Sequence, residues 1–171
     1  PGGPAIENWA KKGNEAAFSF PHPLKGQKNC SFSFSGLKTA ARKLILETDL
    51  TDITTQADFC ASFQRAIAEI LKDRCSNALE MAVEKYPSLN TLAIAGGVAA
   101  NQYFNSALLS CAHDYNINLI SPPPALCTDN GAMVAWAGIE WLRKGGIKKA
   151  LRFSPKPRWP LEDLRSQPYN L

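Results

Sequence analysis

Four short segments of the 171-residue chain carry residue types that could bind a nucleotide or a metal ion. In the first, an apolar run over Leu92–Ala95 leads into Gly96 and Gly97, and Asn101 follows shortly after. Glycine allows positive φ and lets a ligand approach the backbone, and the Asn101 amide can both donate and accept hydrogen bonds. The segment therefore predicts a nucleotide contact at the carboxyl end of a strand, with a purely structural tight turn as the alternative.

The second segment, CTDNGAM, contains a carboxylate that could bind a metal ion. Asp129 could cap the helix that follows, or its oxygen atoms could bind a hard or borderline cation. One aspartate does not complete a metal site, and the sequence offers no second ligand nearby. His22 and His113 each stand alone, and we interpret both as surface or core residues.

Two further segments have functional and structural interpretations of similar weight. In PGGPAIE, Glu7 lies one helical turn beyond Gly3, where its carboxylate could accept both hydroxyls of a ribose or simply favour the first turn of a helix. In FSFSGLKT, hydroxyls, a glycine and Lys38 meet at a strand-to-helix junction, which suits an anion such as phosphate. Packing with capping is the alternative, and the spacing is not that of a P-loop.

Helices and strands must position these segments. An apolar stripe from Thr54 to about Tyr86 predicts either a helix pair or one long helix lying across a sheet. After it, strands interleave with helices, which implies a parallel sheet covered by helices and hence an α/β fold. We expect strands over residues 30–34, 92–95 and 117–120, a loop over 18–29, and helices over 4–13, from 35 through 45, 54–86, 101–111 and 129–143.

The composition, with 45% hydrophobic and 20% charged residues, predicts a globular domain and excludes disorder. No apolar run approaches the ~18 residues of a membrane span. No acid occurs between Glu15 and Glu47, and basic residues dominate from Arg143 onward, a distribution that attracts a polyanion such as RNA or simply forms a solvated surface. Five cysteines without a CxxC pair indicate reduced thiols in a cytosolic or organellar-matrix setting.

Five motifs in order, PGGPAIE, FSFSGLKT, LAIAGGVAAN, CTDNGAM and PRWPL, resemble the C-terminal part of the universal tRNA threonylcarbamoyladenosine transferases, formerly labelled glycoproteases or O-sialoglycoprotein endopeptidases. The resemblance spans Pro1 to Leu161. It implies an actin-like ATPase fold (ASKHA, hexokinase and Hsp70-type). Residues 1–150 would form its second, C-terminal lobe, with 35–87 as a mainly helical insertion, and 151–171 would form an extended basic tail.

The family transfers a threonylcarbamoyl group from threonylcarbamoyl-AMP to the adenosine next to the anticodon, in tRNAs that read codons beginning with A. The resemblance implies a divalent metal, iron or zinc, that polarises the carbamoyl oxygen as AMP leaves, so no catalytic side chain is assigned. It implies tRNA and accessory tRNA-modification proteins as partners, no membrane, and a cytoplasmic or organellar-matrix location. It places the nucleotide at Gly3, Glu7, Gly96, Gly97 and Asn101, and the metal at Asp129.

One departure limits the resemblance. The family's two metal-binding histidines, its first phosphate-binding loop and another ribose-contacting acid belong to an N-terminal half, and neither His22 nor His113 matches those histidines. The chain also begins at Pro1 without an initiator Met, which indicates a fragment. We therefore expect the 171 residues alone to be inactive and to work with the N-terminal half of the same protein, in one chain or two. A non-catalytic nucleotide-binding or scaffold subunit is the alternative, and a metalloprotease is disfavoured because no HExxH motif is present.

Overall fold

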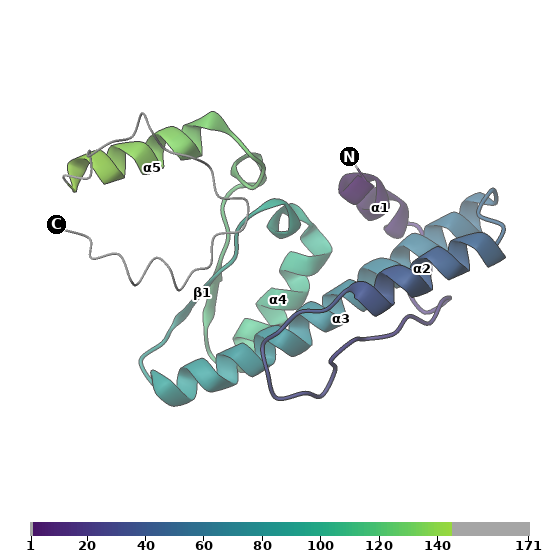
Figure 1. The fold of residues 1–171 in the computed structure, drawn as a ribbon, viewed down its shortest axis with the longest axis horizontal. Helices are drawn as coiled ribbons and strands as arrows, with labels where there is room; N and C mark the ends of the chain where they lie inside the picture. The colour runs from purple at the N-terminus through teal and green to yellow at the C-terminus, as the bar shows by residue number, and fades with distance from the viewer. Residues whose placement is uncertain (1, 145–171) are drawn as a thin grey trace. The chain divides into compact units, whose positions relative to one another are not determined.

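The computed structural model describes residues 2–144 (Figure 1). One compact unit ends at Thr128, and a second begins at Asp129. The elements are α1 (Gly2–Ala10), α2 (Ser35–Glu47), α3 (Ile53–Lys85), β1 (Thr91–Ala93), the 3-10 helix η1 (Gly97–Ala100), α4 (Gln102–Asp114), β2 (Asn118–Ile120), the 3-10 helix η2 (Pro124–Leu126) and α5 (Gly131–Arg143).

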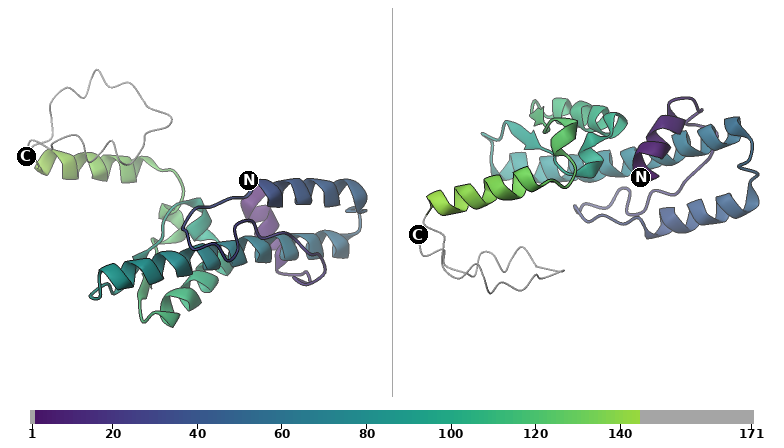
Figure 2. Two further views of the ribbon diagram at one scale, coloured as in Figure 1. Left: turned by 60° about the horizontal axis from the view of Figure 1, so that its bottom comes forward. Right: turned by 90° about the horizontal axis from the view of Figure 1, so that it is seen from above.

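The long apolar stripe forms one helix, α3, of 33 residues rather than a helix pair. Asp52 caps it by accepting a hydrogen bond from the Thr55 amide at 2.7 Å, and Pro87 follows two residues after its end at Lys85. The other helices of the first unit pack along it: α2 runs beside its first half and α4 beside its second half (Figures 1 and 2). The helix α3 is therefore the scaffold of this unit.

Three apolar clusters hold the other elements to α3. The first joins the buried residues Leu37 and Ala41 of α2 to Phe59 of α3, and Phe20 packs edge-to-face on Phe59 at 5.6 Å between ring centroids. A small cluster joins Ala10 of α1 to α3, where the chain approaches so closely that a Cβ at Gly13 would collide with the Ala57 carbonyl. The third cluster consists of Leu79, Cys111, Ala112 and Ile117, with Leu92 and Leu119 packed against it.

The two strands pair in parallel, with Leu92 opposite Leu119. The helix α4 connects them, so that residues 91–120 form a parallel βαβ unit whose apolar side chains pack toward α3. The prediction of a parallel, helix-covered sheet is confirmed, although the sheet has only these two strands within residues 2–144.

The strand expected over residues 30–34 is wrong. Side chains of α3 bond the backbone just before this segment: the buried Arg74 donates to the Asn29 carbonyl at 2.7 Å, and Asn77 donates to the Gln27 carbonyl at 2.6 Å. No strand lies alongside it in the part of the chain that the structure describes. The alternating pattern nevertheless puts Phe32 and Phe34 on one side, where their rings stack.

Several boundaries also shift. The first helix begins at Gly2 and ends at Ala10, so Glu7 lies in its second turn rather than its first. The basic tail over residues 151–171 and the PRWPL motif lie outside the described residues. All five cysteines are free thiols, as expected. None of the helices between residues 2 and 144 is both long and apolar enough to cross a bilayer.

Candidate functional site

The glycine corner lies directly after β1. Gly96 has a φ of 86°, a conformation that glycine permits, and Gly97 begins η1. A Cβ built at either glycine would meet no atom within 4 Å, so the corner faces open space. One 3-10 turn follows, and α4 begins at Gln102, one residue after the predicted start at Asn101. The corner therefore leaves its backbone accessible to a ligand.

Asn101 is the N-cap of α4. Its Oδ1 accepts a hydrogen bond from the Phe104 amide at 3.0 Å, and its Nδ2 donates to Oε1 of Gln64 at 3.0 Å. Gln64 comes from α3 and is only 5% exposed. These two bonds fix the orientation of the Asn101 amide and leave it one N–H and one lone pair for a ligand. A sequence pattern gives no signal for Gln64, because only the packing of α4 on α3 brings it near.

The side chain of Glu7, on α1, contacts the start of α4 next to Asn101. Its Oε1 accepts a hydrogen bond from the Gln102 amide at 3.0 Å, although the two residues are 95 positions apart in the chain. The carboxylate thus lies at the amino end of α4, where the helix dipole favours negative charge. The structure shows a third role besides the two that the sequence suggests, a link between α1 and α4. Gly3 lies one turn earlier on the same face of α1, and nothing lies within 4 Å of a Cβ built there.

A pocket of about 370 Å³ opens between α1, α3 and α4. A second pocket of about 380 Å³ shares three lining residues with it, Glu15, Tyr103 and Ser106. This second pocket is also lined by Arg65, Glu69 and Lys72. The Tyr103 hydroxyl donates to Oε2 of Glu15 at 2.6 Å, and burial followed by this bond raises the pKa of Tyr103 to about 12. The polar residues that line the first pocket are Glu7, Lys11, Glu15, Gln64, Gln102, Tyr103 and Ser106.

Asp129 opens the second compact unit and does not cap α5. The cap is Asn130, whose Oδ1 accepts a hydrogen bond from the Met133 amide at 2.9 Å, so the capping interpretation of Asp129 is wrong. The Asp129 side chain is exposed and forms no hydrogen bond or ion pair with another residue between 2 and 144. Within the same range, no group of three or more His, Cys, Asp or Glu side chains is arranged to hold a metal ion. Asp129 is therefore a single exposed carboxylate, and the side chains of residues 2–144 do not complete a metal site around it.

Of the residues that the sequence singles out, Glu7 lines the first pocket and the others do not. His22 Nε2 lies 3.0 Å from Oε2 of Glu69, whose other oxygen accepts a hydrogen bond from Arg65 at 2.8 Å. The Arg65 guanidinium, more than His22, holds the pKa of the Glu69 carboxyl below its usual value. His113 lies in the last turn of α4. In FSFSGLKT, the Thr39 hydroxyl donates to the Ser35 carbonyl at 3.1 Å and is thus used within α2.

The parallel β1–α4–β2 unit with helices packed against it defines an α/β protein. The sequence profile of the tRNA N6-adenosine threonylcarbamoyltransferase family (TsaD) matches residues 1–136. The chain belongs to this family, which confirms the resemblance that the motifs indicated. The family has a fold of the actin-like ATPase type, and the small parallel sheet is compatible with it.

Curated relatives agree with the profile. A tRNA N6-adenosine threonylcarbamoyltransferase from Anaplasma marginale (strain St. Maries) is 45% identical over 161 residues, which are 94% of this chain and 47% of that protein. A protein of the same name from Ehrlichia canis (strain Jake) is 45% identical over 166 residues, 97% of this chain and 47% of that protein. One from Granulibacter bethesdensis (strain ATCC BAA-1260 / CGDNIH1) is 46% identical over 164 residues. The chain spans about half the length of the curated relatives it matches.

Proposed function

We propose that the chain is the C-terminal lobe of a tRNA N6-adenosine threonylcarbamoyltransferase, with α2 and α3 as its helical insertion. It would take part in moving the threonylcarbamoyl group from threonylcarbamoyl-AMP to the adenosine next to the anticodon. Membership of the family supports the reaction. One observation of the structure supports the site: the hydrogen bond from the Gln102 amide to Glu7 brings the PGGPAIE segment next to Asn101.

The chemistry of this region suits the adenosine part of the substrate. The Glu7 carboxylate has lone pairs beyond the one that accepts from Gln102, and these can accept the hydroxyls of a ribose. The remaining N–H and lone pair of Asn101 suit a base edge or a further ribose oxygen. Gly3, Gly96 and Gly97 leave backbone open for close approach. The role of these residues is thus to bind the nucleotide and fix its orientation.

Asp129 is suited to a metal site because its carboxylate is exposed and unused. It would hold a divalent iron or zinc ion together with ligands from the other half of the protein. When bound, such an ion supplies Lewis-acid polarisation of the carbamoyl carbonyl and stabilises charge on the departing phosphate. Because that chemistry needs no protein nucleophile, the chain's own residues act by binding and positioning, and the 171 residues alone would not catalyse transfer.

Titration of AMP into the 171-residue chain, followed by calorimetry, tests the nucleotide site. We expect binding that Glu7→Gln weakens about tenfold, because the neutral amide is a poorer acceptor for the ribose hydroxyls. Glu84→Gln, an exposed acid near the end of α3, is the matched control and should bind AMP as wild type does. Equal AMP affinity in both variants would refute the assignment of Glu7.

A second measurement tests the reaction. Transfer of the threonylcarbamoyl group to tRNA should be absent with the chain alone and present with the natural protein that carries it, or when the N-terminal half is added as a second chain. If the natural protein binds AMP but transfers nothing, the chain is part of a non-catalytic nucleotide-binding or scaffold subunit.

A further inference from the structure

The outward surface of α2 and the segment before it have an unusual charge distribution. Residues 16–46 contain five Lys and Arg residues and no acid. None of these cations lines the first pocket, where the basic residue is Lys11.

The helix α2 is amphipathic, with one apolar face and one basic face. Leu37 and Ala41 are buried against α3. Lys38 and Arg42 are exposed and lie one turn apart on the outward face. Neither forms an ion pair with any residue that the structure describes, whereas Lys43 lies 3.8 Å from Glu47. Two neighbouring cations are therefore available to a partner.

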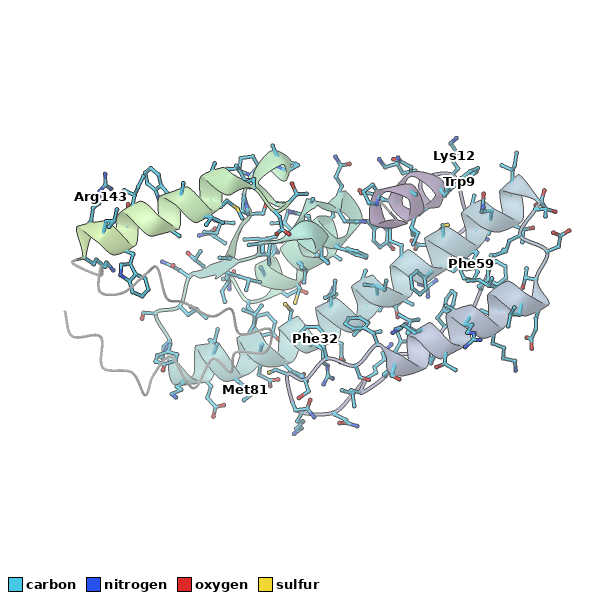
Figure 3. All side chains as sticks on the ribbon, turned by 45° about the horizontal axis from the view of Figure 1, so that its top comes forward. Trp9, Lys12, Phe32, Phe59, Met81 and Arg143 are labelled. Carbon is cyan, nitrogen blue, oxygen red and sulfur yellow. The ribbon has the colours of Figure 1, made fainter. Side chains whose placement is uncertain are left out.

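An exposed aromatic ring lies close to these cations in the sequence. Phe32 is 51% exposed and precedes the start of α2 at Ser35 by three residues (Figure 3). Its ring stacks on that of Phe34, with centroids 6.1 Å apart and an angle of 12° between the planes. Phe34 in turn packs against the apolar cluster that contains Leu37. Phe32 is thus supported on one side by the core and open on the other.

We propose that Phe32, Lys38 and Arg42, here named the α2 surface, bind the tRNA substrate. Lys38 and Arg42 contact successive phosphates, and an unpaired base stacks on the open face of Phe32. Single-stranded RNA is recognised in this way, by stacking on aromatic rings beside phosphate contacts. The proposal deepens the proposed function and rests on it, since that function supplies an RNA with an unpaired loop as the partner.

RNA fits this surface better than a protein or an anionic membrane does. An anionic membrane or a protein partner would use the exposed apolar side chains Ile45 and Leu46, which lie in the last turn of α2. That turn also carries Glu47, and Asp49 and Asp52 follow it, so negative charge gathers at this end. By contrast, Phe32, Lys38 and Arg42 combine an exposed ring with two cations, and residues 16–46 contain no acid.

Binding of tRNA to the natural protein, measured against salt concentration, tests the proposal. We expect Lys38→Gln/Arg42→Gln to raise Kd about tenfold and to reduce the slope of log K against log salt by about 2, one unit for each lost phosphate contact. Lys12→Gln/Lys85→Gln removes the same charge from two exposed lysines elsewhere and should leave both values near wild type.

Phe32 is tested separately. Phe32→Leu keeps an apolar side chain but removes the ring, and should raise Kd about 5- to 150-fold with an unchanged salt slope, the range expected for base–aromatic stacking. Phe32→Tyr keeps the ring and should bind as wild type does. Melting temperature should fall only slightly in Phe32→Leu, because about half of Phe32 is already exposed, and should stay unchanged in Phe32→Tyr.

The outcomes separate this proposal from the proposed function. If wild type transfers the group to tRNA but the α2 variants match the lysine control in both Kd and slope, the α2 surface does not bind tRNA. If the α2 variants lose binding to an accessory protein or to anionic vesicles but still bind tRNA, the surface serves that partner instead and the proposal is overturned. If wild type neither binds tRNA nor transfers the group, the proposed function itself is wrong.

Discussion

The helices α4 and α5 both begin with an asparagine N-cap. In each, an asparagine at the N-cap accepts a hydrogen bond from the amide three residues later: Asn101 from Phe104 at 3.0 Å, and Asn130 from Met133 at 2.9 Å. The junctions differ in what surrounds the cap. At α4, the candidate ligand residue is the cap itself, and it is also bonded to the buried Gln64. At α5, the cap is the neighbour of the candidate residue Asp129.

This difference predicts different couplings between stability and binding. Asn101 is part of the packing between α3 and α4, so any change there alters both the fold and the site. Asp129 is exposed and used by no other described side chain, so it can be removed without loss of packing. One junction couples ligand binding to stability, and the other keeps them apart.

The largest expected effect is at Asp129. In the natural protein, Asp129→Ala should lower kcat/KM for transfer at least about 100-fold, because it removes a metal ligand, and leave the melting temperature unchanged. Asn130→Ala is the matched control, since it removes the α5 cap at a cost of about 1 kcal/mol and keeps the carboxylate. Threonylcarbamoylation assays and thermal melts of both variants provide the measurement. Wild-type turnover by Asp129→Ala would show that the residue binds no essential metal.

Asn101 should behave in the opposite way. Asn101→Ala removes the α4 cap and leaves Gln64 without its partner, so we expect a loss of about 2–3 kcal/mol in the free energy of unfolding together with weaker AMP binding. Asn101→Asp retains the cap oxygen but loses the Nδ2 donor. It should therefore keep most of the stability while still binding AMP weakly. If Asn101→Asp binds AMP as tightly as wild type, the amide donor does not contact the nucleotide.

The hydrogen bond between Gln64 and Asn101 should contribute less to the free energy of unfolding than the whole Asn101 side chain does. A double-mutant cycle of Gln64→Met and Asn101→Ala, followed by urea unfolding, should give a coupling energy of about 1 kcal/mol, because the Asn101 Nδ2 group bonds directly to Gln64. Gln56→Met on the same helix has no such bond and should couple to Asn101 by less than about 0.3 kcal/mol. Equal coupling for the two glutamines would mean that Gln64 contributes only general packing.

Local rules predicted the parts of the molecule that depend on neighbours in the chain. The apolar stripe over α3, the glycine corner with positive φ at Gly96 and the parallel strands β1 and β2 are all found in the structure. The motifs also led to the correct family. Each of these features is encoded within a few tens of residues, where periodicity, turn chemistry and motif order can be read.

Two features were missed because they depend on contact between distant segments. Alternation predicted a strand at residues 30–34, but the side chains of Arg74 and Asn77 bond the preceding backbone and no partner strand lies there. The link from Glu7 to Gln102 spans 95 positions. The capping of α5 by Asn130 instead of Asp129 is a choice between adjacent residues, and boundary shifts of one residue lie below the resolution of sequence patterns.

The smallest expected effect is a pH dependence confined to the α4 side. Burial and the bond to Glu15 raise the pKa of Tyr103 from its ordinary value of 10 to about 12, so the folded chain favours the protonated phenol. The stability that this bond supplies is complete below about pH 10 and is lost as pH rises toward 12, because the unfolded chain ionises first.

Urea unfolding at pH 9 and pH 11.5 tests this dependence. The free energies of unfolding of wild type and Tyr103→Phe should differ at pH 9 and converge at pH 11.5. The difference between wild type and Gln64→Met should stay constant over the same interval, because the hydrogen bond from Asn101 to Gln64 joins two amide groups that do not titrate. A gap between wild type and Tyr103→Phe that does not change with pH would mean that the phenol is not held in its protonated form by the fold.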